Sequence, residues 1–130
     1  MRVLGLDLGS VTCGVAVSDM MGMVARGVLT LRFPEDDYAK AAELVKEQIE
    51  EFQVKTVVLG LPKHMNGDIG IRGEICIAFK ERLEAYGVEV VLWDERLTTI
   101  AADVSRKKRK KVIDQMAAVQ ILQSYLDRKG

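Results

Sequence analysis

The sequence is poor in several residue types, and each shortage excludes a class of protein. Its 130 residues include two cysteines, Cys13 and Cys76, which lie far apart and outside any C-x-x-C pattern. They indicate neither a disulfide framework nor a zinc knuckle, and we expect both as small buried residues. Aromatic residues make up only 5%, too few for a single-strand-binding surface built on base stacking.

Histidine and long apolar runs are scarce as well. His64 is the only histidine, so a Ser-His-Asp or Cys-His mechanism would depend on it entirely, and it lies in a predicted loop without a nucleophile at a telling distance. No apolar run approaches membrane-spanning length, and Met1 leads directly into a strand-like segment rather than into a signal peptide. We therefore expect a cytoplasmic protein with no membrane partner.

The composition that is present suits a compact domain. Hydrophobic residues make up 48% of the chain and charged residues 29%, far from the compositions that stay disordered. A chain of 130 residues is long enough to bury most of its apolar surface in one core. We predict a single domain over residues 1–130.

The formal net charge of zero hides a segregated distribution. Six of the 19 basic residues are consecutive, namely Arg106, Lys107, Lys108, Arg109, Lys110 and Lys111. On an otherwise acidic body, such a strip is a candidate contact for nucleic-acid phosphates, and a merely solvated loop is the alternative.

The hydropathy pattern predicts three strands, then helix, strand, helix, strand and helix. The expected strands cover residues 3–8, 15–18, 24–31, 56–61 and 88–93, and the expected helices cover residues 41–52, 75–86 and 113–125. We interpret Met20, Met21 and Met23 as packing and turn residues between the second and third strands. The order predicts an α/β fold, a five-stranded mixed sheet with helices on both faces. The strands that contain Asp7, Leu59 and Val91 should be adjacent and parallel.

Carboxylates gather where these strands end. Asp7 interrupts an apolar strand near its end, Asp94 and Glu95 follow another, and Asp114 stands at the start of the last helix. Ligand sites of open α/β sheets form beyond the carboxyl ends of the parallel strands. The sequence therefore predicts an acidic site at that edge of the sheet.

A carboxylate in an apolar strand costs free energy unless it is paired or bound to metal. The sequence offers no equally placed arginine or histidine as a partner for Asp7. Oxygen ligands at an open site favour hard cations, so we predict Mg²⁺ or Mn²⁺ and phosphodiester cleavage. The alternative is that Asp94 and Asp114 only cap the helices that follow them.

Four ordered motifs resemble the YqgF/RuvX family. They are Gly5 to Ser10 with Gly14 to Asp19, Leu59 to Pro62 with Met65, Asn66, Gly67 and Gly70, Asp94 to Thr99, and Ile113-Asp114 with Ala117, Ala118 and Ile121 to Leu126. The chain departs from the family pattern at Thr12-Cys13, where many relatives carry a basic residue.

The resemblance implies a ribonuclease H-like fold and a role in maturing the 5′ end of pre-16S ribosomal RNA. It also implies that Asp7, Glu95 and Asp114 are the catalytic and metal-binding acids. Since a strand turns alternate side chains to opposite faces, only one of Asp94 and Glu95 should point inward, and Asp94 is the expected capping residue. Arg96, Thr98 and Asn66 are then expected nucleic-acid contacts.

Several functions remain open at this point. Precursor ribosomal RNA and four-way DNA junctions would present the same phosphates to the same acids, so a Holliday junction resolvase is an alternative. A nucleic-acid-binding module without catalysis is another. Asp7 to Ser10 also resembles the first phosphate motif of sugar kinases and actin, although those proteins need two such domains. The sequence does not distinguish a monomer from a homodimer.

Overall fold

The structure is a computed structural model that describes residues 1–62, 69–97 and 110–129, with only the backbone described at 97, 110–114 and 129. Within these described residues, five strands and three α-helices follow one another in the predicted order. They are β1 (Val3–Leu8), β2 (Thr12–Ser18), β3 (Ala25–Arg32), α1 (Tyr38–Phe52), β4 (Thr56–Leu61), α2 (Gly70–Glu84), β5 (Glu89–Asp94), the 3₁₀ turn η1 (Glu95–Leu97) and α4 (Lys110–Lys129). The predicted element order is confirmed.

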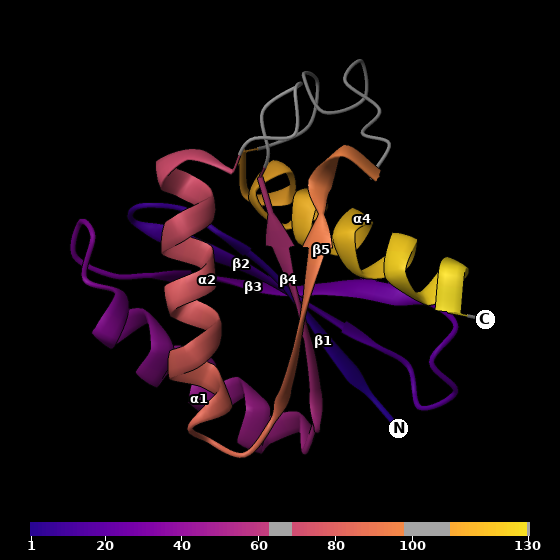
Figure 1. Ribbon diagram of the computed structural model, residues 1–130. Coiled ribbons are helices and arrows are strands. Elements are labelled where there is room, and N and C mark those ends of the chain that lie inside the picture. Colours follow the sequence, from indigo (N-terminus) through magenta and orange to yellow (C-terminus); the bar gives the residue numbers. More distant parts are fainter. Residues whose placement is uncertain (63–68, 98–109, 130) are drawn as a thin grey trace.

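The strands form one mixed sheet in the order β3-β2-β1-β4-β5 (Figure 1). The strand β1 is central, antiparallel to β2 and parallel to β4, and β4 is parallel to β5. Leu59 lies opposite Leu6 on one side and Leu92 on the other. The prediction that the strands of Asp7, Leu59 and Val91 are adjacent and parallel is therefore confirmed.

Helices cover both faces of this sheet, as predicted. The larger core lies under α1 and α2, where Leu4 and Leu6 of β1 pack with Val45 and Phe79. The smaller core lies under α4. Its fully or nearly fully buried members are Val3, Ala16, Val58, Ala118, Ile121, Leu122 and Leu126. Alternation along β1 thus sends its even-numbered residues to one helix layer and its odd-numbered residues to the other.

Glycines allow α4 to lie close to its face of the sheet. A Cβ added at Gly5 would lie 2.6 Å from Leu122 Cβ and 3.2 Å from the backbone oxygen of Ala118. At Gly27 the nearest atom would be Gln115 Oε1 at 2.7 Å, and at Gly60 it would be Ile121 Cδ1 at 2.6 Å. The α4 layer therefore tolerates no side chain at these three sheet positions without a shift.

We expect Gly5→Ala to lower the free energy of unfolding by about 1–3 kcal/mol, the usual cost of overpacking a core. The obstructing atoms are a Cβ and a backbone oxygen of α4, which cannot rotate away, so the helix itself must move. Urea denaturation would measure the change. A variant as stable as the parent would contradict the close packing of α4 on β1.

One boundary differs from the prediction. The sequence predicts a helix only from residue 75, after the stretch that contains Gly70 and Gly73, but α2 begins at Gly70, where φ is +71°. Gly73 lies within this helix. An added Cβ there would collide with Ile69 and approach the backbone oxygen of Pro62. This glycine serves close packing at the end of β4 rather than a turn.

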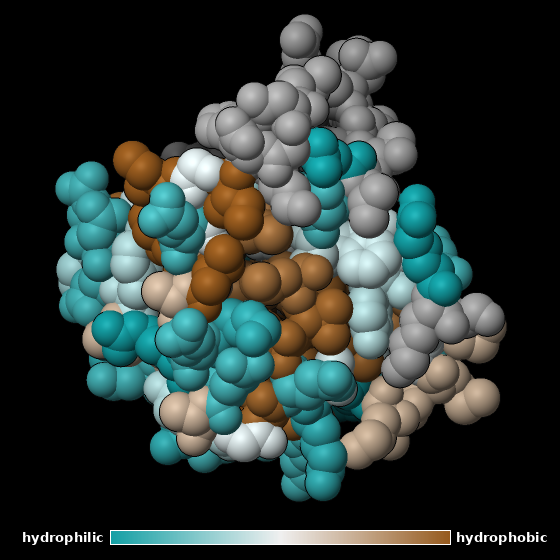
Figure 2. Space-filling model, viewed as in Figure 1, coloured by the Kyte–Doolittle hydropathy of each residue, from teal (hydrophilic) through white to brown (hydrophobic). Residues whose placement is uncertain are grey.

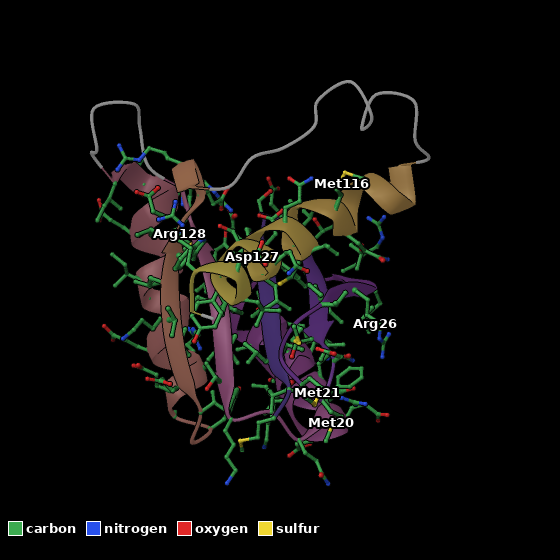
Figure 3. The ribbon with its side chains drawn as sticks, turned by 90° about the vertical axis from the view of Figure 1, so that its right-hand side faces the viewer. Met20, Met21, Arg26, Met116, Asp127 and Arg128 are labelled. Carbon is green, nitrogen blue, oxygen red and sulfur yellow. The ribbon has the colours of Figure 1, made fainter. Side chains whose placement is uncertain are left out.

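The methionines between β2 and β3 are turn residues, as expected, but the prediction that they pack is wrong. Met20, Met21 and Met23 are 64%, 78% and 65% exposed. Figure 3 shows Met20 and Met21 at the end of the molecule opposite to the start of α4, where Met116 is labelled. They extend beyond the end of the sheet, where neither core reaches them.

The strand β5 forms one edge of the sheet, and its residues after Val90 are only partly buried. In Figure 2, apolar residues gather on the surface between α2 and α4, where this strand runs. Among the residues described, no helix is long and apolar enough to span a membrane.

Candidate active site

The carboxyl ends of β1, β4 and β5 meet at one edge of the sheet, at the top of Figure 1. The helices α2 and α4 begin at the same edge. Open α/β sheets bind ligands at such an edge because side chains from several strand ends converge there. Three of the acids singled out in the sequence, Asp7, Asp94 and Glu95, lie in or directly after these strand ends.

Asp7 lies in β1, one residue before its end, and is partly buried. It lies opposite Gly14 of β2, a neighbour without a side chain. Gly5, two residues earlier, faces Leu122 of α4, and alternation places Asp7 on the same face. The carboxylate therefore belongs to the α4 side of the sheet.

Glu95 opens the 3₁₀ turn after β5 and lies over Gly60 of β4. Its Oε2 atom is 2.8 Å from the point where a Cβ at Gly60 would be, and Ile121 of α4 borders the same point. Because Leu6 pairs with Leu59, the next residues along β1 and β4 are Asp7 and Gly60. The Glu95 side chain thus lies over β4, the strand next to that of Asp7. It is on the same face of the sheet as Asp7.

The electrostatics link the two acids. Burial, reinforced by the negative charges of Asp7 and Asp94 and opposed by the positive charge of Arg72, raises the pKa of Glu95 to about 7. Two partly buried carboxylates that repel each other bind protons or cations more readily than an isolated exposed one. The carboxylates of Asp7 and Glu95 therefore favour the binding of a positively charged ligand.

Asp94 has a different set of contacts. Its carboxylate accepts hydrogen bonds from the backbone N–H of Arg96 at 2.9 Å and from the Arg96 guanidinium, with Nη2 to Oδ2 at 2.8 Å. The first contact is that of a cap at the start of the 3₁₀ turn. Asp94 and Arg96 form an ion pair, and the side chain beside Asp7 is that of Glu95.

Arg72 is the residue at this edge that the sequence reasoning missed. The first turn of α2 brings Arg72 to the end of β1, where it donates to the Leu8 carbonyl at 3.1 Å rather than pairing with a carboxylate. Its charge opposes the rise in the pKa of Glu95. The early start of α2, hidden by its glycines, is the signal that would have revealed it.

Several predicted residues cannot be placed. Asp114 lies in α4, but its side chain is outside the described residues, as are those of Lys110 and Lys111. His64, Asn66, Thr98 and residues 106–109 also lie outside the described residues. Among the side chains that are described, no three of His, Cys, Asp and Glu are arranged to hold a metal ion.

The two cysteines are buried, as expected, in the core under α1 and α2. Burial, reinforced by the charge of Asp7, raises the pKa of the Cys13 thiol well above its usual range. Burial also raises the pKa of Cys76 to about 11. Because the thiolate is the nucleophilic form, neither residue is a nucleophile at neutral pH.

The donor set at this edge fits a hard divalent cation. Asp7 and Glu95 supply carboxylate oxygens from neighbouring positions of one sheet face, and their mutual repulsion would be relieved by a cation between them. The thiols of Cys13 and Cys76 belong to the opposite core. Oxygen ligands without accompanying sulfur or imidazole select Mg²⁺ or Mn²⁺ rather than zinc.

Comparison with protein families gives one family over nearly the whole chain. The model described as "RuvX: Holliday junction resolvase" matches residues 1–128. A Bacillus subtilis relative named "Putative pre-16S rRNA nuclease" is 54% identical and covers 98% of both chains. A Staphylococcus aureus relative of the same name is 53% identical and covers 97% of this chain and 95% of its own.

Two resolvases are among the solved structures of similar architecture. The chain matches Thermus thermophilus RuvC in complex with a Holliday junction substrate with a TM-score of 0.64, 15% identity and 100% and 96% coverage of the two chains. A Fowlpox virus resolvase bound to Holliday junction DNA matches with a TM-score of 0.62, 15% identity and 99% coverage of both. At this identity the likeness concerns the fold, and it confirms the predicted ribonuclease H-like class.

Proposed function

Because the chain belongs to the RuvX family, we propose that it is a metal-dependent endonuclease that hydrolyses phosphodiester bonds. The observation that carries this proposal is the pairing of Asp7 with Glu95 on one sheet face, together with the raised pKa of Glu95. We propose the 5′ end of pre-16S ribosomal RNA as the substrate and the cytoplasm as its location, since relatives more than 50% identical are named for that RNA.

Asp7, Glu95 and Asp114 are the residues that we propose to hold Mg²⁺ or Mn²⁺. Such a cation, when bound, lowers the pKa of water and stabilises charge on phosphate oxygens. The chain itself fixes the two described acids: β1 carries Asp7 at its end, and Gly60 leaves room for Glu95 beside it. The Asp94–Arg96 ion pair holds the turn from which Glu95 projects.

The test is cleavage by the purified chain in Mg²⁺ or Mn²⁺, with EDTA as the metal-free control. Two labelled substrates should be offered, a precursor RNA containing the 5′ end of 16S ribosomal RNA and a four-way DNA junction. We expect the RNA to be cut. Absence of metal-dependent cleavage of either substrate would contradict the proposal and favour a binding module without catalysis.

A Holliday junction resolvase is the second candidate, because the family model carries that description and resolvases share the fold. Symmetrical cutting of paired strands would require two active sites related by a two-fold axis. Preferential cleavage of the junction by a homodimer would favour this candidate, whereas RNA cleavage by a monomer would exclude it.

Metal binding should depend on pH through Glu95. Its pKa is about 7, so lowering the pH from 8 to 6 protonates most of a group that must be ionised to bind metal. We expect Mg²⁺ affinity, measured by calorimetry, to fall roughly tenfold over this range. Glu95→Gln should bind Mg²⁺ weakly at both values, with that dependence removed. If Mg²⁺ affinity depends on pH equally in the parent protein and in Glu95→Gln, a group other than Glu95 controls binding.

The basic strip, residues 106–111, should supply affinity without sequence preference, since phosphate contacts release counterions but read no bases. Replacing Lys107, Lys108 and Lys110 by alanine should therefore make the dependence of nucleic-acid binding on salt shallower. Binding titrations between low and moderate salt would measure the slope. An unchanged slope would show that the strip is only solvated.

A further inference from the structure

Arg72 occupies a fixed place at the active-site edge. Gly73, the next residue, packs against Ile69 and the backbone oxygen of Pro62, at the end of β4. This contact sets the position of the first turn of α2 relative to the sheet. The guanidinium of Arg72 consequently lies at the end of β1, the strand that carries Asp7.

Two neutral groups hold the guanidinium in place. Nη2 donates to the Leu8 carbonyl at 3.1 Å, and Nη1 donates to the Tyr38 hydroxyl at 3.1 Å. The Tyr38 hydroxyl in turn donates to Asp36 Oδ1 at 3.1 Å, which leaves its oxygen free to accept from Arg72. Segments from β1, α1 and α2 therefore converge on this one side chain.

The charge of Arg72 has no carboxylate partner among the described residues. Two other cations in this part of the chain pair with acids, Arg96 with Asp94 and Lys80 with Glu84, both at 2.8 Å. Arg72 is partly buried, and it forms no such ion pair with any described acid. The charge of Arg72 acts to lower the pKa of Glu95, but the two side chains form no ion pair.

A partly buried cation held by neutral acceptors near two acids indicates an anionic ligand that completes the site. A guanidinium has five N–H donors in a planar fork, and two atoms of Arg72 are engaged by protein acceptors. The remaining donors suit phosphate oxygens, which guanidinium binds with two parallel hydrogen bonds. The acids beside it are the proposed place of phosphodiester hydrolysis.

We propose that Arg72 binds a backbone phosphate of the strand being cut, next to the scissile phosphate. This assignment rests on the proposed nuclease function and adds a substrate contact to it. Arg72 lies on the α2 side of the acids. The phosphate that it binds would therefore lie between the acidic pair and the start of α2.

Binding measurements with matched variants test the assignment. In an Asp7→Asn background, which prevents cutting, Arg72→Gln is compared with Arg82→Gln, an exposed arginine in the last turn of the same helix. The probes are a labelled RNA hairpin and a labelled four-way DNA junction. We expect Arg72→Gln to bind roughly tenfold more weakly, with a salt slope shallower by about 0.7–0.9, and Arg82→Gln to match its parent.

A purely structural role for Arg72 predicts a different result. If the side chain only joins α2 to β1 and α1, Arg72→Gln would lower the melting temperature but leave the salt slope equal to that of Arg82→Gln. That outcome would overturn the proposal. Tyr38→Phe, which removes the acceptor but keeps the charge, should weaken binding less than Arg72→Gln and leave the slope unchanged.

A scan with methylphosphonate probes locates the contact. Neutralising one phosphate at a time should identify a position at which affinity falls for the protein with Arg72 but not for Arg72→Gln. If Arg72→Gln does not fold, Arg72→Lys takes its place, because it keeps the charge but loses the fork geometry. Equal loss at every position in both proteins would overturn the assignment. Binding without metal-dependent cleavage by the unaltered chain would instead contradict the nuclease function alone.

Discussion

Asp7→Asn should reduce cleavage by a factor on the order of 1000 or more while the protein still folds and binds nucleic acid. The amide keeps the shape of the side chain but loses the charge needed to hold a divalent cation, and metal ions contribute several kcal/mol to stabilising the transition state. Single-turnover cleavage in Mg²⁺ would measure the loss. Thermal unfolding should show no loss of stability, because the substitution removes a charge that repels Glu95.

Binding by Asp7→Asn should be equal to or tighter than that of the parent, most clearly at low salt, where repulsion between the carboxylate and phosphates is least screened. Asp94→Asn is the matched control, since its carboxylate is paired with Arg96 at the same edge. We expect a much smaller loss of activity there. An Asp7→Asn protein that cuts at a near-normal rate would exclude the metal-carboxylate mechanism.

Gly60→Ala should reduce activity about 100-fold with only a modest loss of stability. The new methyl group would lie 2.8 Å from Glu95 Oε2 and 2.6 Å from Ile121 Cδ1. Both atoms are at the ends of flexible side chains, so the fold can accommodate the methyl group, but Glu95 must move. Displacing a catalytic group by about 1 Å can cost a factor of 100 in rate. Cleavage assays and urea denaturation on the same variant would separate the two effects.

The double variant Gly60→Ala/Ile121→Val provides the control for this prediction. Valine lacks the Cδ1 atom, so the second change removes the collision with α4 and leaves the collision with Glu95. Stability should recover, and activity should not. Recovery of both would show that the helix, rather than Glu95, mediates the loss.

The strands were predictable because their apolar runs are short, continuous and bounded by glycine or proline. Asp7 was recognisable as a charge within such a run, and its place at the end of a parallel strand followed from the order of elements. Alternation predicted only that one of Asp94 and Glu95 points inward. The choice of Glu95 came from the resemblance to the YqgF/RuvX family, and its role in binding metal remains a prediction.

Arg72 was not predictable by the same reasoning. Gly70 and Gly73 read as loop residues, yet Gly73 permits a helix to touch the backbone of Pro62. That contact depends on tertiary packing, and the hydrophobic periodicity of the sequence does not reveal tertiary packing. The exposure of Met20, Met21 and Met23 has a similar origin, since no element of the sequence reveals that the turn extends beyond both cores.

The parallel pairing of the sheet has a consequence for the order of folding. The antiparallel neighbours β1, β2 and β3 are joined by short turns, whereas β1 must pair with β4 from Val3 to Thr56, and β4 with β5 from Thr56 to Glu89. Closing such long loops loses chain entropy before any contact is gained, which slows folding. Asp7 and Glu95 come together only after both closures. Nuclease activity should therefore return later during refolding than the secondary structure of the N-terminal strands.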